Sequence, residues 1–227
     1  MITAHHLVFG RKAIVKNEGL ILDLPFQNSF VDATGKNTMI AGGASNLPTF
    51  TLEGGEYAAT FNGSQSLKTN SNFNIGTDKV SISLWLKTSQ TAAAIVSEIS
   101  TNASSGNNAF GVYINDLLAN RIEIVDNQSG LNIGNSAINI NDNNWHHIVL
   151  MIDRSLGTSQ NKIYVDGILS YVKNTSYQSD LNGNWALNPL FIGQRGGSKL
   201  GLNGQIKFLK IFNYLLSTTE ITNLYNE

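Results

Sequence analysis

The stretch that decides the fold reads Asn143-Asn144-Trp145-His146-His147-Ile148-Val149-Leu150-Met151-Ile152-Asp153, followed by Lys162-Ile163-Tyr164-Val165-Asp166-Gly167. From Trp145 to Ile152 the run is apolar on both faces, which is typical of a central strand covered on each side. The second stretch ends in Asp166-Gly167 and another apolar run follows it directly. An Asp-Gly pair between two such runs is a strong signal for a β-hairpin. This part of the chain therefore predicts neighbouring antiparallel strands.

Short strand-like runs punctuated by turns fill most of the remaining chain. Residues 80–86 alternate, which places Val80, Ile82, Leu84 and Leu86 on one face. Further strand-like runs cover residues 20–26, 57–61, 110–115 and 121–126, and Asn-Gly pairs at 62–63, 182–183 and 203–204 mark turns. This spacing predicts an antiparallel sandwich rather than βαβ units.

Only one segment has a helical pattern, and it lies at the end of the chain, over residues 216–225. Ser217 followed three residues later by Glu220 is a capping box, and Leu216 with Ile221 can form a hydrophobic staple around it. The sequence therefore predicts an all-β fold of two antiparallel sheets with one short C-terminal helix.

Composition limits the classes of protein to which the chain can belong. Its 227 residues are 41% hydrophobic, which suffices for one large all-β domain. A net charge of −1 gives no field that would recruit nucleic acid or an anionic membrane. The chain has no run of membrane-spanning length, so no membrane insertion is expected. It has no cysteine, which excludes disulfides and thiolate metal sites.

An ordered series of motifs carries a family resemblance. The motifs are Leu22–Phe26, Val31–Gly35, Ala59–Gly63, Ser81–Leu86, Asn143–Asp153, Lys162–Gly167, Pro189–Gly193 and Leu202–Phe212. In this order they resemble the laminin G-like jelly rolls of the concanavalin A-like lectin/glucanase superfamily. The resemblance implies a jelly roll over residues 19–227 and leaves residues 1–18 outside it. Members include lectins, adhesion modules, carbohydrate-binding modules and virion proteins, so the fold alone does not fix the function.

The same resemblance raises the question of calcium. Some members bind the ion through a carboxylate in the opening loop, where Asp32 fits, and another just after the Asn-Gly turn of the penultimate strand. At the second place members often carry Ile-Asp-Glu, whereas this chain has Ile206-Lys207-Phe208. A lysine there puts a cation where calcium needs an anionic oxygen. We therefore expect no cofactor, with Asp32 as the single candidate metal ligand.

The carboxylates do not form the pair that glycoside hydrolysis requires, because that pair must face one cleft. Glu123 and Asp126 are three residues apart on one strand, which puts them on opposite faces. Glu53 and Glu56 have the same spacing and lie in a Gly-rich turn. The sequence therefore predicts that the protein is not an enzyme.

Two adjacent histidines, His146 and His147, invite a metal-site interpretation. Adjacent strand residues point to opposite faces, so their rings cannot chelate one ion without distorting the strand. We expect one ring to pack and hydrogen-bond inside the sandwich and the other to lie under a loop.

Sugar sites require exposed aromatic rings surrounded by polar groups. Trp185 is the candidate for stacking, because Asn182-Gly183-Asn184 and Asn188-Pro189 place it in a loop. The alternative is that Trp185 caps one end of the sandwich as a hydrophobic lid. Trp85 and Trp145 lie in strands with apolar neighbours and are expected in the core. The predicted sugar contacts are Trp185, Tyr177, Asp180, Asn184 and Arg195.

The first hypothesis is a non-catalytic, lectin-like module that binds a cell-surface glycan or a polysaccharide. The alternative is an adhesion, structural or assembly protein, such as a virion decoration or fibre component. Residues 2–16 favour the alternative, because they contain the apolar run Leu7-Val8-Phe9 and can add a strand to a partner or join protomers in a homo-oligomer. Residues 1–16 lack the apolar core of a signal peptide. Cell surface, extracellular space and virion are the expected locations.

Overall fold

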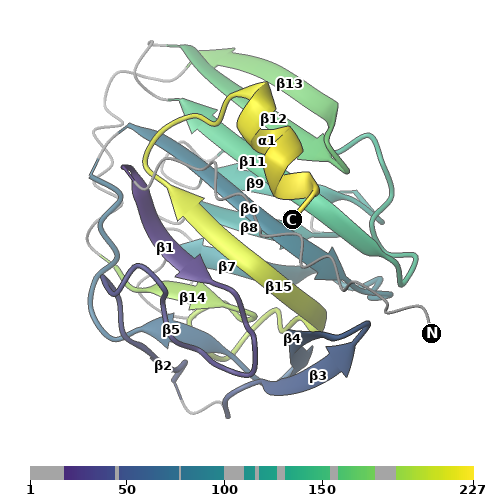
Figure 1. Cartoon of the computed structure of the whole chain (residues 1–227). Helices are drawn as coiled ribbons and strands as arrows, with labels where there is room; N and C mark the ends of the chain where they lie inside the picture. Colours follow the sequence, from purple (N-terminus) through teal and green to yellow (C-terminus); the bar gives the residue numbers. More distant parts are fainter. Residues whose placement is uncertain are drawn as a thin grey trace, which may run out of the picture.

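Two antiparallel sheets packed face to face make up the protein (Figure 1). The computed structural model describes residues 18–43, 46–76, 78–99, 110–115, 118–126, 131–153, 158–176 and 188–227. Every strand pair is antiparallel. The predicted all-β jelly-roll sandwich is confirmed.

Sheet A has the strand order β13-β12-β11-β6-β15-β4-β3, with β1 paired to β15. Sheet B has the order β10-β9-β8-β7-β14-β5-β2. The strands of sheet A are β1 (Leu20–Leu24), β3 (Thr49–Glu53), β4 (Glu56–Asn62), β6 (Lys79–Lys87), β11 (Trp145–Asp153), β12 (Thr158–Val165), β13 (Ile168–Ser176) and β15 (Asn203–Phe212). Those of sheet B are β2 (Met39–Ala41), β5 (Leu67–Thr69), β7 (Ala94–Ile99), β8 (Phe110–Ile114), β9 (Ile122–Asp126), β10 (Leu131–Asn135) and β14 (Leu190–Ile192).

The core lies between the two sheets, and strand alternation determines which side chains enter it. Val80, Ile82, Leu84 and Leu86 of β6 are fully buried there, as their alternation predicts. Strand β11 lies between β6 and β12 and is buried from His147 to Asp153. The prediction of a central strand is confirmed.

Helix α1 (Thr218–Tyr225) packs on the outer face of sheet A, the face turned away from sheet B (Figure 1). The predicted capping box is present: the Ser217 hydroxyl accepts the N–H of Glu220, and the Glu220 carboxylate accepts the N–H of Ser217. The helix and the sheet bury a second apolar cluster, made of Leu20, Val149, Met151, Tyr164, Phe212, Leu216, Ile221 and Leu224. The helix therefore covers part of the outer face that β11, β12 and β15 contribute.

Two tight hairpins shape the edges of sheet A. Asp166 and Gly167 join β12 to β13 with φ values of 54° and 75°, the left-handed pair that a type I′ turn requires. Gly54 and Gly55 join β3 to β4 with φ values of 62° and 88°. The first turn confirms the predicted hairpin. Residues 1–17 lie outside the described part of the chain, so the predicted division at residue 18 stays a prediction.

Candidate functional site

Most of the predicted sugar contacts lie outside the described residues. These are Trp185, Tyr177, Asp180 and Asn184, and their grouping around Arg195 stays a prediction. Arg195 itself lies in the connection from β14 to β15, where its N–H donates to the carbonyl of Lys199 at 2.7 Å. Its guanidinium carbon is 5.3 Å from the ring centroid of Tyr113, a buried residue of β8. Arg195 is therefore half-buried against sheet B.

The opening loop is organised around Asp32, the candidate metal ligand. Its buried carboxylate accepts hydrogen bonds from the backbone N–H groups of Asp23, Thr34 and Asn37 at 2.9–3.0 Å. It also accepts the Thr34 hydroxyl at 2.7 Å and the Asn37 side-chain amide at 2.8 Å. A carboxylate offers about four lone-pair positions, so these donors occupy the oxygens that calcium would need. This geometry favours a structural role for Asp32.

The electrostatics of Asp32 agree with that role. Burial raises the pKa of Asp32, but the hydrogen bonds from Asp23, Asn37 and Thr34 outweigh burial and the net pKa lies below its usual value. Among the described residues, no group of three histidine or acidic side chains is arranged to hold a metal ion. Calcium binding at Asp32 stays a prediction, to be tested by metal removal.

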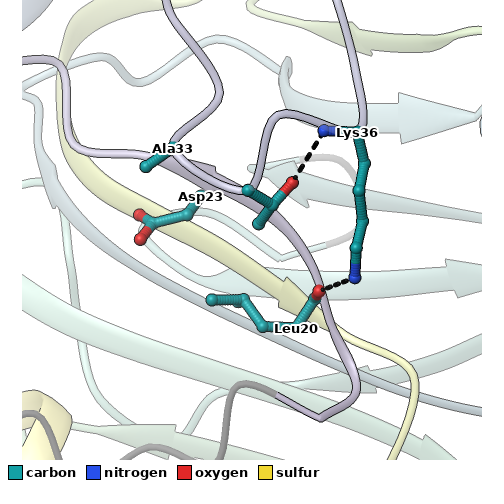
Figure 2. Close-up of a pocket in the computed structure, with 5 residues that line it drawn as sticks. Leu20, Asp23, Ala33 and Lys36 are labelled. Atoms are coloured by element: carbon teal, nitrogen blue, oxygen red, sulfur yellow. Dashed lines mark hydrogen bonds between the residues drawn. The ribbon is translucent and has the colours of Figure 1, made fainter.

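A cavity of about 340 Å³ lies beside this loop and is lined by Leu20, Asp23, Ala33, Thr34 and Lys36 (Figure 2). The Lys36 side chain lines the cavity, and its ammonium group donates to the carbonyl of Leu20 at 2.6 Å (Figure 2). Within the described part of the chain, Oδ1 of Asp23 is buried and meets no hydrogen-bond donor. Burial chiefly raises the pKa of Asp23, while Lys210 opposes the change. None of the residues that line the cavity is a predicted sugar contact.

The two histidines occupy opposite faces of β11, as their adjacency requires. His146 lies at the end of the strand between two carboxylates, with Nδ1 2.8 Å from Asp166 and Nε2 3.1 Å from Asp142. His147 is buried, and its Nε2 is 2.9 Å from the Ser83 hydroxyl. Its ring lies on the outer face of sheet A, beside Trp85 and Tyr225, rather than inside the sandwich. The two rings therefore cannot share a metal ion.

The structure corrects the expected burial of Trp85 and Trp145. Both side chains are half-buried on the outer face of sheet A. Trp85 lies between Leu84 and Leu86, which face the core, so its side chain faces outward. Trp145 pairs with Lys87, which lies on the same outer face. The alternation of β6 carried this signal, since a residue between Leu84 and Leu86 must face away from the core. The apolar neighbours of both tryptophans led to the prediction that they lie in the core.

Two lysines accompany these tryptophans. The ammonium nitrogen of Lys207 lies 4.9 Å from the ring centroid of Trp145 and 5.6 Å from that of Trp85. The ammonium nitrogen of Lys87 lies 5.9 Å from the Trp145 centroid. These distances are within the range of cation–π attraction.

Two glutamates complete the group, and they correct a second expectation. Glu53 and Glu56 are directly opposite in the β3–β4 hairpin, so the turn puts both on one face of the sheet. Lys87 donates to both oxygens of Glu53 at 2.8 and 3.0 Å, and Lys207 donates to Glu56 at 2.7 Å. We call the six residues Trp85, Trp145, Lys87, Lys207, Glu53 and Glu56 the tryptophan–lysine platform.

A β-bulge places Lys207 in the platform. The register of β15 against β6 shifts between Lys207 and Lys210, and Phe208 within the bulge has a φ of 52°. Without the extra residue, two lysines three positions apart would point to opposite faces. With it, Lys207 lies opposite Trp85 and Lys210 lies opposite Ser83, both on the outer face. Nothing in the sequence Ile206-Lys207-Phe208-Leu209 marks the bulge.

The charges of the platform stabilise one another. Hydrogen bonds from Lys87 lower the pKa of Glu53, and a hydrogen bond from the Trp145 side chain lowers it further. Tyr225, at the end of α1, stacks on Trp85 with centroids 5.7 Å apart and ring planes 15° apart. The stacking of Tyr225 on Trp85 therefore joins the platform to α1 on one side. On the other side the platform continues across β4 and β3.

Solved structures with a similar fold include domains of larger proteins. Domain 4 of AbnA, an extracellular GH43 arabinanase from Geobacillus stearothermophilus solved with arabinotriose, matches with a TM-score of 0.65 and 16% identity, covering 91% of this chain and 98% of that chain. The botulinum neurotoxin DC binding domain matches with a TM-score of 0.67 and 18% identity in its complex with rat synaptotagmin II, covering 92% of this chain and 52% of that chain. The same toxin domain solved with SialylT matches with a TM-score of 0.63 and 19% identity, covering 92% of this chain and 52% of that chain. This chain therefore spans about half the length of the toxin binding domains.

The curated proteins contain no match to this chain. A family model described as the concanavalin A-like lectin/glucanases superfamily matches residues 61–222, which is more than half of the chain. Strands β1 to β3 and most of β4 precede that region and belong to the same two sheets. By its sequence and its fold, the chain belongs to the laminin G-like family of the concanavalin A-like lectin/glucanases superfamily.

Proposed function

We propose that the protein is a non-catalytic, lectin-like module that binds a cell-surface glycan or a polysaccharide. The observation that carries the proposal is the tryptophan–lysine platform: two half-exposed indole rings, flanked by ammonium and carboxylate groups, on one open sheet face. An aromatic face stacks on the apolar face of a sugar ring, and the charged groups hydrogen-bond to its hydroxyls. Among these residues, Trp145 is the proposed stacking residue, because Trp85 is already covered by Tyr225.

The state of the carboxylates supports binding rather than hydrolysis. A glycosidase needs one carboxylic acid that stays protonated near neutral pH. Glu53 and Glu56 share a face, but each pairs with a lysine, and the pKa of Glu53 is lowered. Glu53 therefore lacks the proton that a general acid would donate.

The fold relatives support the same class of function. One is a domain solved with arabinotriose, and another is a toxin binding domain solved with SialylT. The first belongs to an extracellular arabinanase and the second to a botulinum neurotoxin, which supports an extracellular or cell-surface location. No helix in the described part of the chain is long and apolar enough to cross a membrane.

A glycan and polysaccharide array tests the proposal, run once with calcium and once with chelator. We expect selective binding that Trp145→Ala weakens by about two- to tenfold, because aromatic contacts of this kind contribute on the order of 0.5–1.5 kcal/mol. Trp185→Ala is the matched control, and alanine variants of Tyr177, Asp180, Asn184 and Arg195 test the other predicted contacts. A blank array, or binding that ignores Trp145, would contradict the platform proposal. If only Trp185→Ala abolished glycan binding, the binding site would include Trp185 rather than the platform.

An assembly role is the second candidate, and the outer edge of β13 favours it. This strand ends sheet A, and its Ile168, Leu169 and Val172 are 64%, 48% and 47% exposed. An exposed apolar edge strand is a template for pairing with another chain. The predicted contribution of residues 2–16 lies outside the described residues.

Sedimentation analysis of the full chain tests the assembly role. If the edge mediates association, an oligomer forms and Ile168→Lys combined with Val172→Lys dissociates it. Removal of residues 1–18 tests the terminal segment in the same way. A monomer at every concentration would contradict self-association.

A further inference from the structure

The tryptophan–lysine platform carries no net charge, because its ammonium groups are matched one to one by carboxylates. Lys87 pairs with Glu53 at 2.8 Å and Lys207 pairs with Glu56 at 2.7 Å. Lys207 is also held near both indole rings, so its position is fixed by three neighbours. A ligand that arrives at this face meets two closed ion pairs rather than two available cations.

The carboxylates are the more accessible half of each pair. The side chain of Glu53 is 47% exposed against 20% for Lys87, and that of Glu56 is 31% exposed against 17% for Lys207. An anionic sugar would therefore approach carboxylates before it reached an ammonium group. At about 4 Å, repulsion between like charges is unfavourable even in water and larger near a protein surface.

Neutral hydrogen-bonding groups continue the platform across the sheet. Gln205 of β15 lies opposite Lys87 on one side and opposite Thr60 of β4 on the other. Its amide donates to the Thr60 hydroxyl at 3.3 Å, and Thr60 in turn shares a hydrogen bond of 2.7 Å with Thr51 of β3. Neighbouring strands lie about 4.8 Å apart, so the surface from β11 to β3 extends over roughly 19 Å. That length accommodates several sugar units in a row.

We infer, on the basis of the proposed function, that the ligand of this platform is an uncharged polysaccharide lying across β11, β6, β15, β4 and β3. Its hydroxyls donate to Glu53 and Glu56 and accept from Lys87, Lys207 and the Gln205 amide, while the Trp145 ring packs on a sugar face. Glycans that carry sialate, uronate or sulfate groups are rejected, because their anions meet the exposed carboxylates. The two glutamates thus determine specificity by charge.

Binding to neutral and anionic polysaccharides at low and high salt tests the inference. A neutral arabinan or glucan is compared with polygalacturonate and heparin by affinity electrophoresis. We expect binding to a neutral polymer that changes less than about twofold between low and high salt, since no charge is neutralised. Polygalacturonate and heparin are expected to bind at least about tenfold more weakly at low salt.

The decisive variant is Glu53→Gln combined with Glu56→Gln, which keeps the size of both side chains and one acceptor oxygen on each while removing the charge. It leaves Lys87 and Lys207 unmatched, so we expect new binding to polygalacturonate that high salt abolishes. The control pairs Glu18→Gln with Asp78→Asn, both at exposed positions away from the platform, and gives the same change in net charge. Gain of anionic binding in the control as well would overturn the inference.

Three other outcomes are distinguishable. If the wild-type protein prefers an anionic polymer through Trp145, the inference fails and the proposed function stands. If the glutamine variant gains no anionic binding, the role of the glutamates in specificity is wrong. If no polymer binds, or if binding does not depend on Trp145, the proposed function of the platform fails and the inference fails with it.

Discussion

Lys207 stands where some members of the family carry a carboxylate for calcium, and its surroundings account for the difference. Its ammonium group binds Glu56 and lies near the rings of Trp85 and Trp145. The same position that serves a metal in some family members here supports an aromatic surface. The lysine was visible in the sequence, but its partners were not, because they come from β4, β6 and β11.

Asp32 provides a test at the level of one residue. Asp32→Ala removes the acceptor for donors from Asp23, Thr34 and Asn37, and we expect the free energy of unfolding to fall by about 3 kcal/mol. Because the pKa of Asp32 is lowered, its contribution is present above the unfolded value of 3.8 and is lost as pH falls through the folded value. Urea unfolding at neutral and acidic pH measures both effects, with Asp78→Asn as an exposed control.

The same samples decide the calcium question. If Asp32 is structural, calcium and chelator give the same melting temperature. A rise of several degrees with calcium that Asp32→Ala abolishes would show instead that the opening loop holds a metal ion.

At the scale of elements, the start of β11 joins two turns through one imidazole. His146 bridges Asp142, in the loop before the strand, and Asp166, in the β12–β13 turn. Burial lowers the pKa of His146, but hydrogen bonds to Asp166 and Asp142 outweigh it and the net pKa is raised. The neighbouring His147 is different: burial lowers its pKa to about 4. Opposite faces of one strand thus give adjacent histidines opposite responses to pH.

These shifts predict how stability depends on pH. The His146 contribution is fully present below the unfolded pKa of 6.5 and is lost as pH rises through the raised folded value. His147 is neutral in the folded protein down to a pH of about 4, whereas in the unfolded chain it takes up a proton below pH 6.5. The free energy of unfolding therefore falls by about 3 kcal/mol as the pH drops from 6.5 to about 4. We expect His146→Gln to remove the fall in unfolding free energy that accompanies rising pH, and His147→Gln to reduce the fall that accompanies acidification. Urea unfolding measures both. Identical pH profiles for both variants would contradict the assignment.

At the scale of the whole molecule, the fold could be predicted and the surface could not. Several strands carry their own signal, such as the alternation from Val80 to Leu86 or the Asp166-Gly167 turn, and the order of the signals identifies the family. The sequence patterns do not predict β2, β3, β5, β7 and β10. The platform is assembled from β3, β4, β6, β11 and β15, and depends on a hairpin that aligns two glutamates and a bulge that turns Lys207 outward. Neither feature has a local sequence pattern that specifies side-chain grouping.

The central claim is that Trp145, rather than Trp185, contacts the glycan. The chain has three tryptophans, so its ¹⁵N–¹H spectrum contains three indole N–H signals, which single substitutions assign. Titration with a neutral oligosaccharide taken from the best array polymer is the most direct measurement. Our account predicts that the Trp145 signal shifts in proportion to saturation, with a smaller shift for Trp85 and none for Trp185. A shift confined to Trp185 would contradict it and place the binding surface in the loops.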